Sequence, residues 1–381
     1  MTPTQWQSAF RAVRKTGCFP FLVAAALHAD PRNPDTDWMS GQYGVGFHFL
    51  KGAQQGQLPD WNQSVALFDA EKFAADVERT GAKWVLFTLG QNSGYYCAPN
   101  RVLDSISGYQ PGQRNSLRDL PMDISKALEP KGIRMLFYLP SSVPTGDARI
   151  AAAFGLSQRE PGGANYMVNE AFMHKWAQVI REWSLHYGGK LHGWWFDGYY
   201  RRVGFTDSLG KIYRDAVRAG NARSVLSLCG GIRDQEELRA ISNWSDYLCG
   251  EQNDAAWIPK ERWYTGSDGL GPVQWQTFAQ FTPDWTQDGN RYGDDAYVNY
   301  ANATLKNGGA ITWNLYVNAN GSISPGVMAQ LDRTRSRIRP APLRLGPVSG
   351  PAQGETPGRR FSGLVFFSRW GLFDAAGRAA R

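Results

Sequence analysis

The chain alternates short β-rich runs with amphipathic helical stretches from about Gly41 to Ile338, and this alternation limits the fold more than any other feature. Strands that alternate with helices predict a parallel sheet, because a helix returns the chain to the edge where the next parallel strand must begin. Eight such strands predict an α/β fold of the (β/α)8 TIM-barrel type. We place the strands at residues 44–49, 82–90, 133–140, 191–198, 224–231, 246–251, 273–279 and 310–316.

The stretches between these strands carry helix signals. The clearest is FDAEKFAADVERT, residues 68–80, in which apolar residues recur at helical spacing between Asp69 near the start and Gly81 after the end. An acid before the first turn and a glycine after the last turn are typical of helix boundaries. Further helices are predicted at residues 124–128, 169–187, 211–218, 234–240, 294–306 and 325–338.

Composition changes on both sides of the predicted catalytic barrel, residues 41–340. In the N-terminal segment, residues 1–40, a basic patch precedes the apolar run Cys18–Ala29. Residues 1–29 are therefore either a secretory signal, which predicts a secreted or periplasmic protein, or a first helix, which leaves a cytoplasmic one. Residues 341–381 form a Pro/Gly-rich linker and a short Arg-rich C-terminal tail. No apolar run is long enough to span a bilayer, so we expect no membrane partner.

The formal net charge of +7 does not predict nucleic-acid binding by the barrel. Residues 333–381 contain ten arginines and two acids, so the rest of the chain is nearly neutral. The four cysteines form no CxxC pair, which indicates neither a zinc site nor a disulfide framework, and Cys229 and Cys249 are expected to be buried thiols. P-loop, Rossmann and zinc-protease motifs are missing, so no metal or cofactor is expected.

Three polar side chains lie at the ends of predicted strands: His48 at the end of the first, Asp197 of the fourth and Glu251 of the sixth. Catalytic groups of TIM barrels lie at this C-terminal end of the strands. In LHGWWFDGYY, residues 191–200, an aromatic run suited to a strand buried on both faces ends at Asp197 and Gly198. Two carboxylates across a barrel mouth can cleave a glycosidic bond. The structural alternatives are a helix cap for Asp197 and a surface loop for Glu251.

Residues 41–338 resemble the α-L-fucosidases of glycoside hydrolase family 29. YGVGFHF is similar to that family's first-strand motif ending in HWG, WFDG to its nucleophile strand, and DYLCGE to its D-[YF]-x-T-x-E segment. The resemblance implies that Asp197 is the nucleophile, Glu251 the acid/base and His48 a sugar-binding histidine. WQTFAQFTPDW and KNGGAITWNLYVNANGSIS also resemble family segments. Glu261, on the loop after Glu251, is a reserve acid/base.

The chain departs from the family after the second strand. GQNSGYY stands where the family has K-H-H-D-G-F, so Gln91 and Asn92 replace two sugar-binding histidines. Glutamine and asparagine can hydrogen-bond sugar hydroxyls but carry no charge. The resemblance therefore supports the barrel fold more strongly than the identity of the bound sugar. The chain also holds 15 Trp and 16 Tyr, which either stack on sugars or fill the core. The candidates for stacking are Tyr95, Trp195, Trp257 and Trp313.

These features predict a retaining exo-glycosidase that releases a terminal α-L-fucose or a related sugar from a carbohydrate. The alternative is a non-catalytic carbohydrate-binding barrel whose site has decayed, as the replaced histidines suggest. The sequence leaves the linkage and the oligomeric state open.

Overall fold

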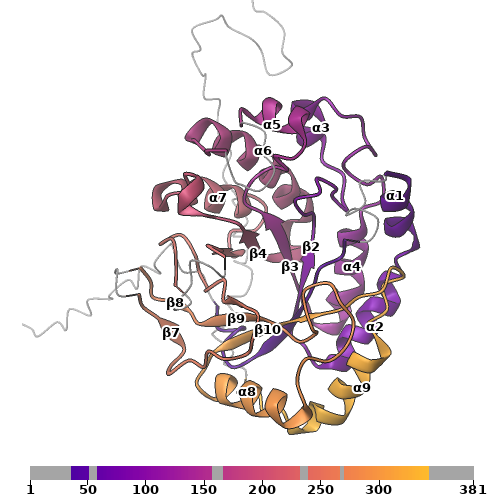
Figure 1. The fold of residues 1–381 in the computed structure, drawn as a ribbon, viewed down its shortest axis with the longest axis vertical. Helices are drawn as coiled ribbons and strands as arrows, with labels where there is room; N and C mark the ends of the chain where they lie inside the picture. Colours follow the sequence, from indigo (N-terminus) through magenta and orange to yellow (C-terminus); the bar gives the residue numbers. More distant parts are fainter. Residues whose placement is uncertain (1–35, 51–57, 157–165, 232–238, 267–269, 343–381) are drawn as a thin grey trace, which may run out of the picture. The chain divides into compact units, whose positions relative to one another are not determined.

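The computed structural model describes residues 36–50, 58–156, 166–231, 239–266 and 270–342. It confirms the predicted (β/α)8 barrel (Figure 1). Eight strands of one parallel sheet follow the order β5-β4-β3-β2-β1-β10-β9-β6 within these ranges. They are β1 (Tyr43–Phe47), β2 (Trp84–Thr88), β3 (Arg134–Pro140), β4 (Leu191–Asp197), β5 (Val225–Leu228), β6 (Glu251–Gln252), β9 (Gln276–Gln280) and β10 (Ala310–Leu315). A separate antiparallel pair joins β7 (Trp263–Tyr264) to β8 (Val273–Gln274).

The segment before β6 joins the two ends of this strand order. The Asp246 N–H donates to the Leu226 carbonyl on β5 (2.7 Å), and the Asp246 carbonyl accepts from the Gln274 N–H on β8 (3.0 Å). Tyr247 pairs with Gln274 as a parallel bridge. The predicted strand 246–251 therefore lies between β5 and β8, although only its last residue, Glu251, belongs to β6.

Side chains alternate between the barrel interior and the surrounding helices. On β1, Val45 and Phe47 pack toward the helices, while Gly44 and Gly46 face the interior. A Cβ atom at Gly44 would lie 2.2 Å from the Trp84 ring, and one at Gly46 would lie 2.6 Å from the Phe278 ring. Glycine is needed at both positions because large aromatic rings already fill the interior.

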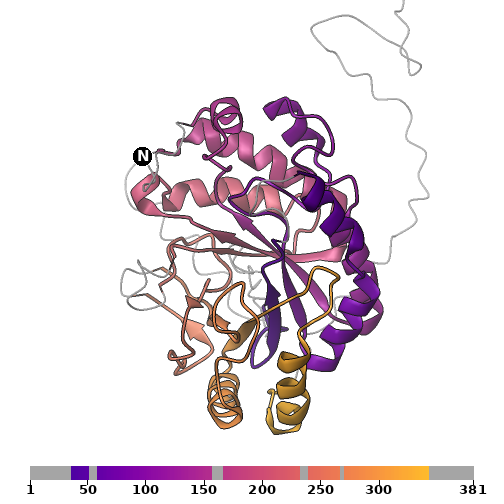
Figure 2. The same ribbon diagram turned by 45° about the vertical axis from the view of Figure 1, so that its right-hand side comes forward.

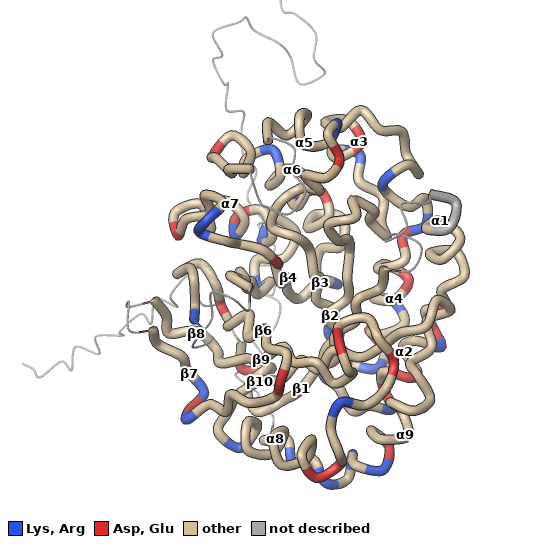
Figure 3. The backbone as a smooth tube through the Cα atoms, in the orientation of Figure 1, with Lys and Arg blue, Asp and Glu red and all other residues tan. Residues whose placement is uncertain are grey.

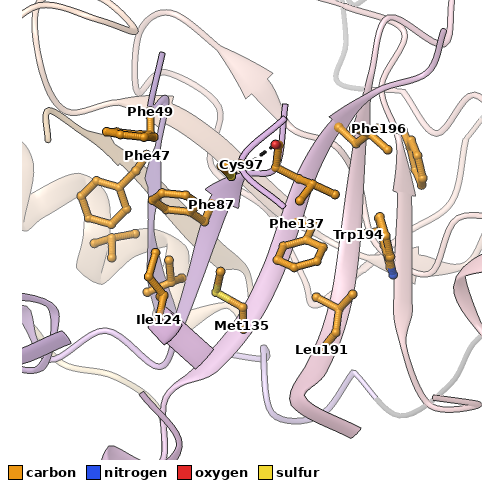
Figure 4. Packing of buried hydrophobic residues seen from close by; sticks show 14 of the residues in the cluster. Phe47, Phe49, Phe87, Cys97, Ile124, Met135, Phe137, Leu191, Trp194 and Phe196 are labelled. Carbon is orange, nitrogen blue, oxygen red and sulfur yellow. Dashed lines mark hydrogen bonds between the residues drawn. The ribbon is translucent and has the colours of Figure 1, made fainter. Parts of the chain in front are cut away.

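The helices form the outer layer of the barrel (Figure 2). Between them and the strands lies an apolar layer in which Phe47 packs on Phe73 at a ring distance of 4.8 Å. In the same layer Phe137 packs on Trp194 at 5.3 Å (Figure 4). The helices are α1 (Leu58–Leu67), α2 (Ala70–Thr80), α3 (Arg101–Ser107), α4 (Leu120–Leu128), α5 (Ala148–Phe154), α6 (Glu170–Tyr187), α7 (Asp207–Val217), α8 (Asp294–Lys306) and α9 (Pro325–Thr334).

Helix boundaries follow the capping residues. The Asp69 carboxylate accepts from the Lys72 N–H and Gly81 adopts φ 79°, which fixes α2 at Ala70–Thr80 rather than at the predicted 68–80. The last predicted helix is shorter than 325–338, because α9 ends at Thr334 and continues only as a 3-10 turn. Residues 1–35, 343–381 and most of the predicted helix 234–240 lie outside the described ranges.

Charged residues lie chiefly on the helices and loops, and the strands carry few of them (Figure 3). In the part of the chain that the structure describes, no helix is both long and apolar enough to cross a bilayer.

Candidate active site

Strand register places Asp197 and Cys229 opposite each other at the C-terminal ends of β4 and β5. Trp195 pairs with Ser227 and Phe196 with Leu228, so the next pair along is Asp197 and Cys229. The Cys229 N–H donates to the Phe196 carbonyl (2.8 Å), and the Tyr199 N–H donates to the Cys229 carbonyl (2.7 Å). Because side chains alternate along a strand, both Asp197 and Cys229 face the interior, as Trp195 does.

Glu251 at the start of β6 completes a three-residue cluster. Ligand-type atoms of Asp197, Cys229 and Glu251 all lie within 4.8 Å of one another. The Cys229 thiol donates to Glu251 Oε2, with an Sγ to Oε2 distance of 3.2 Å. The two acids at the ends of β4 and β6 therefore meet in the barrel mouth.

Asp197 is held by side chains from the neighbouring strands. The Tyr138 hydroxyl, on β3, donates to Asp197 Oδ2 (2.5 Å), and it accepts in turn from Gln91 Nε2 (2.5 Å). Helix α7 begins only at Asp207, so Asp197 is not the cap of the next helix.

Burial raises the pKa values of both carboxyls, but their other neighbours act in opposite directions. Burial raises the pKa of Asp197, although hydrogen bonds from Tyr138 and the Gly198 N–H oppose that shift. Burial also raises the pKa of Glu251 to about 8, and the neighbouring Asp197 charge adds to the shift. Since two donors stabilise its carboxylate, Asp197 loses its proton first, and its charge then holds the proton on Glu251. One charged and one neutral carboxyl is the pairing that acid/base cleavage requires.

His48 follows β1 and is neutral in this site. Its Nδ1 lies 2.8 Å from Asn314 Oδ1, and Asn314 Nδ2 donates to the Trp285 carbonyl (3.1 Å). This arrangement makes Asn314 Oδ1 an acceptor and places the histidine proton on Nδ1. Burial lowers the pKa of His48 to about 4. The remaining nitrogen, Nε2, can therefore accept a hydrogen bond from a hydroxyl group.

A cavity of about 270 Å³ opens above Asp197. Its lining is mostly neutral and polar, with Asn92 on one side and Tyr200 and Arg202 on another. The Arg202 guanidinium lies 3.8 Å from the centre of the Tyr200 ring. A larger hollow, about 400 Å³, lies over α6 beside Asp119 and His186, on the outer helical layer.

The four predicted stacking residues are scattered. Trp195 lies in the barrel interior, stacks on Tyr138 at 5.2 Å and donates to the Cys249 carbonyl. Trp313 faces outward and packs on Tyr297 and Tyr300 of α8. Tyr95 is buried against Trp61 and Arg114, and Trp257 is 44% exposed on the loop after β6. Of the four, Trp195 lies nearest to the acids in these contacts, because it stacks on Tyr138, whose hydroxyl donates to Asp197.

Glu261 lies at the opposite end of the barrel. It borders a hollow with Ser40 and Gly308, which precede β1 and β10. The N-terminal ends of the strands are one barrel length away from Asp197, so Glu261 cannot serve as a reserve acid/base. The loop after β6 runs down the outside of the barrel, which the sequence did not indicate.

Sequence reasoning missed two residues of the site, Tyr138 and Cys229. Tyr138 was read only as part of a strand, although it stands two positions before the strand's end, where an inward side chain reaches the mouth. Cys229 was correctly predicted to be buried. Its place near the end of the predicted fifth strand, residues 224–231, was the signal that it also reaches the site.

Comparisons with known proteins agree with this architecture. A family model described as Alpha-L-fucosidase matches residues 24–333. Among solved structures, the endo-fucoidan hydrolase P5AFcnA of glycoside hydrolase family 107 is 15% identical with a TM-score of 0.60, covering 79% of this chain and 92% of its own. The α-L-fucosidase AlfC from Lactobacillus casei is 16% identical with a TM-score of 0.55, and the match covers 79% of this chain and 96% of AlfC.

A family 29 α-L-fucosidase from Bacteroides thetaiotaomicron is 14% identical with a TM-score of 0.56, covering 79% of this chain and 73% of its own. The chain spans about half of another similar structure, the endo-fucoidan hydrolase MfFcnA4, covering 54% of it. A search of curated proteins gave no match. The family match covers most of the chain and agrees with the fold and with the acids at the strand ends. The chain therefore belongs to the α-L-fucosidase family of glycoside hydrolases.

Proposed function

We propose that this chain is a retaining exo-glycosidase that removes a terminal α-L-fucose, or a closely related sugar, from a carbohydrate. The observation that carries the proposal is the Asp197–Glu251 pair, whose oxygens approach within 4.8 Å at the barrel mouth. Retaining glycosidases hold their two carboxyls about 5–5.5 Å apart, whereas inverting enzymes separate them by roughly 6.5–9.5 Å to admit a water molecule. The close pair favours retention.

The roles follow from the environments of the two acids. Asp197, the more readily ionised, attacks the anomeric carbon while Glu251 donates its proton to the leaving oxygen. Glu251, then a carboxylate, takes a proton from water, which attacks the same carbon and releases Asp197. His48, Gln91 and Asn92 hydrogen-bond sugar hydroxyls, and Trp195 supports the floor of the site. The solved family 29 enzyme from Bacteroides thetaiotaomicron, trapped as a covalent intermediate, supports the same two-step course.

Release of one terminal unit is favoured by the size of the cavity. Its volume of about 270 Å³ is at the small end of ligand pockets, which commonly hold roughly 300–1,000 Å³. The lining includes Asn92 and Asp197 but not Glu251, His48 or Gln91, so this volume describes the Asp197 side of the site. Incubation with an α-L-fucan polymer should release monosaccharide while the polymer length falls slowly, and an early fall in polymer length would instead show cleavage within the chain.

Substitution of the two acids tests the mechanism. Asp197→Ala should lower kcat/KM on an activated aryl α-L-fucoside by on the order of 10³-fold or more, because the covalent step is lost. Glu251→Ala should regain turnover with added azide and give the glycosyl azide of retained configuration. Glu261→Ala, at the far end of the barrel, is the control and should leave kcat/KM unchanged.

Full activity in Asp197→Ala, or an inverted azide product from Glu251→Ala, would contradict the assignment. The non-catalytic alternative predicts saturable sugar binding with no reducing ends released by the unmodified chain. It loses support because the family has been identified and both acids meet in the mouth.

A further inference from the structure

Cys229 is a buried thiol at the centre of the catalytic cluster, and the mechanism above does not use it. Its Sγ lies 3.2 Å from Glu251 Oε2. The Gly231 N–H donates to the same sulfur (3.3 Å), so one lone pair of the sulfur is occupied. The register opposite Asp197 places this sulfur beside Glu251, and a hydrogen bond also joins it to Cys249.

The thiol remains protonated and can act only as a donor toward the carboxylate. Burial raises the pKa of Cys229 well above its usual range, and the neighbouring Cys249, Glu251 and Asp197 add to that shift. A protonated thiol donates a weak hydrogen bond, which stabilises the ionised form of Glu251 more than the neutral form.

The hydrogen bond also distinguishes the two oxygens of Glu251. The thiol donates to Oε2, so Oε1 is the oxygen that this hydrogen bond does not engage. Because the two oxygens share one rigid plane, holding Oε2 fixes where Oε1 points. Oε1 is then the oxygen that carries the proton toward the leaving group.

We propose that Cys229 is a positioning residue for the acid/base, holding Glu251 through Oε2 so that Oε1 delivers and later recovers the proton. This inference rests on the proposed function of Glu251. Cys229 itself forms no bond to substrate, and no electron or proton leaves its sulfur during the cycle.

Several groups face Glu251 and set its protonation together. Asp197 lies at the end of β4, Cys229 directly follows β5, and Cys249 lies in the segment before β6. The hydroxyls of Tyr138 and Tyr200 also lie close enough for the Glu251 charge to raise their pKa values. Among these, Cys229 donates to the Glu251 carboxylate and lowers its pKa, against burial and Asp197, which raise it. Loss of the thiol therefore raises the pKa of Glu251.

The test compares Cys229→Ala with Cys229→Ser on two aryl α-L-fucosides, one with an activated and one with a poor leaving group. Only the poor leaving group needs a proton from Glu251 during bond cleavage. Cys229→Ala should lower kcat/KM about three- to tenfold on the poor leaving group, and much less on the activated one. Its alkaline limb of kcat/KM should move to higher pH. Cys229→Ser, which keeps a donor, should recover both.

Cys97→Ala is the matched control, because Cys97 is also a buried free cysteine but its thiol donates to the backbone carbonyls of Thr88 and Leu89. It should reproduce any loss of thermal stability caused by deleting a buried sulfur, without a dependence on the leaving group.

Equal losses on both substrates, an unmoved alkaline limb or no recovery in Cys229→Ser would overturn the inference. Glu251→Ala separates this failure from failure of the proposed function. If Glu251→Ala shows the leaving-group dependence and azide rescue while Cys229→Ala does not, only the role of Cys229 is wrong. If Glu251→Ala shows neither, both proposals are wrong.

Discussion

At the scale of single residues, the nucleophile candidate depends on a tyrosine from the next strand. Tyr138 pairs with Trp195, two residues before Asp197, so both side chains face the interior on adjacent strands. The Tyr138 ring is long enough to span that two-residue offset, which brings its hydroxyl to Asp197 Oδ2. This donor lowers the pKa of Asp197 against the effect of burial.

Tyr138→Phe removes the donor while keeping the ring that stacks on Trp195. Without the hydrogen bond the pKa of Asp197 rises, so the acidic limb of kcat/KM should move to higher pH. A hydrogen bond to a charged group contributes about 1.5–3 kcal/mol, so kcat/KM should fall by roughly 10- to 100-fold. The pH profile measures both effects. Tyr95→Phe, a buried tyrosine outside the cluster, is the control, and an unmoved acidic limb in Tyr138→Phe would exclude this role.

At the scale of elements, the barrel is closed by one buried aspartate between β5 and β6. Asp246 accepts two contacts from Arg218 Nη2 (3.0 and 3.1 Å) and one from the Leu226 N–H (2.9 Å). Its backbone joins β5 on one side and β8 on the other. The Asp246 carboxylate thus accepts the β5 hydrogen bond from Leu226 that a regular β5–β6 ladder would otherwise satisfy.

Asp246→Ala should destabilise the fold strongly, because it leaves the Arg218 charge and the Leu226 N–H without their buried acceptor. Removing one partner of a buried ion pair costs about 3–5 kcal/mol. Urea unfolding followed by circular dichroism measures the change. Asp215→Ala, which breaks the exposed pair with Lys211 on α7, should cost less than about 1 kcal/mol. Similar values for the two variants would show that Asp246 does not close the barrel.

The same scale explains how far the sequence could predict the site. Strand ends are visible in the sequence, so Asp197, Glu251 and His48 were placed at the mouth. Which face packs on the helices was not visible, because both faces of strands such as AITWNL are buried. Trp313 pairs with Val45 and Ala279 and so faces α8. Its neighbours Thr312 and Asn314 take the inward positions on this strand.

Over the whole molecule, the Asp197–Glu251 pair places two acids in a low-dielectric barrel mouth, and this opposes folding. A carboxyl whose pKa is higher in the folded chain than in the unfolded chain binds more protons when folded. For Glu251 the pKa is about 8 in the folded chain against 4.5 for the free side chain. Protonated Glu251 therefore costs the fold nothing below its pKa in the unfolded chain. As the pH rises through its pKa in the folded chain, Glu251 must ionise while buried, and the folded chain loses stability.

Glu251→Gln should thus stabilise the folded chain in a way that depends on pH. Each unit of pKa difference corresponds to about 1.4 kcal/mol, so over the window between the two pKa values the gain should reach on the order of a few kcal/mol. We expect similar melting temperatures for the variant and the parent chain near pH 4.5, and a higher melting temperature for the variant at pH 8. Differential scanning calorimetry at several pH values measures the difference. Glu261→Gln, on the exposed far end, should show no such trend, and a difference that stays constant with pH would mean that Glu251 is not held protonated in the folded chain.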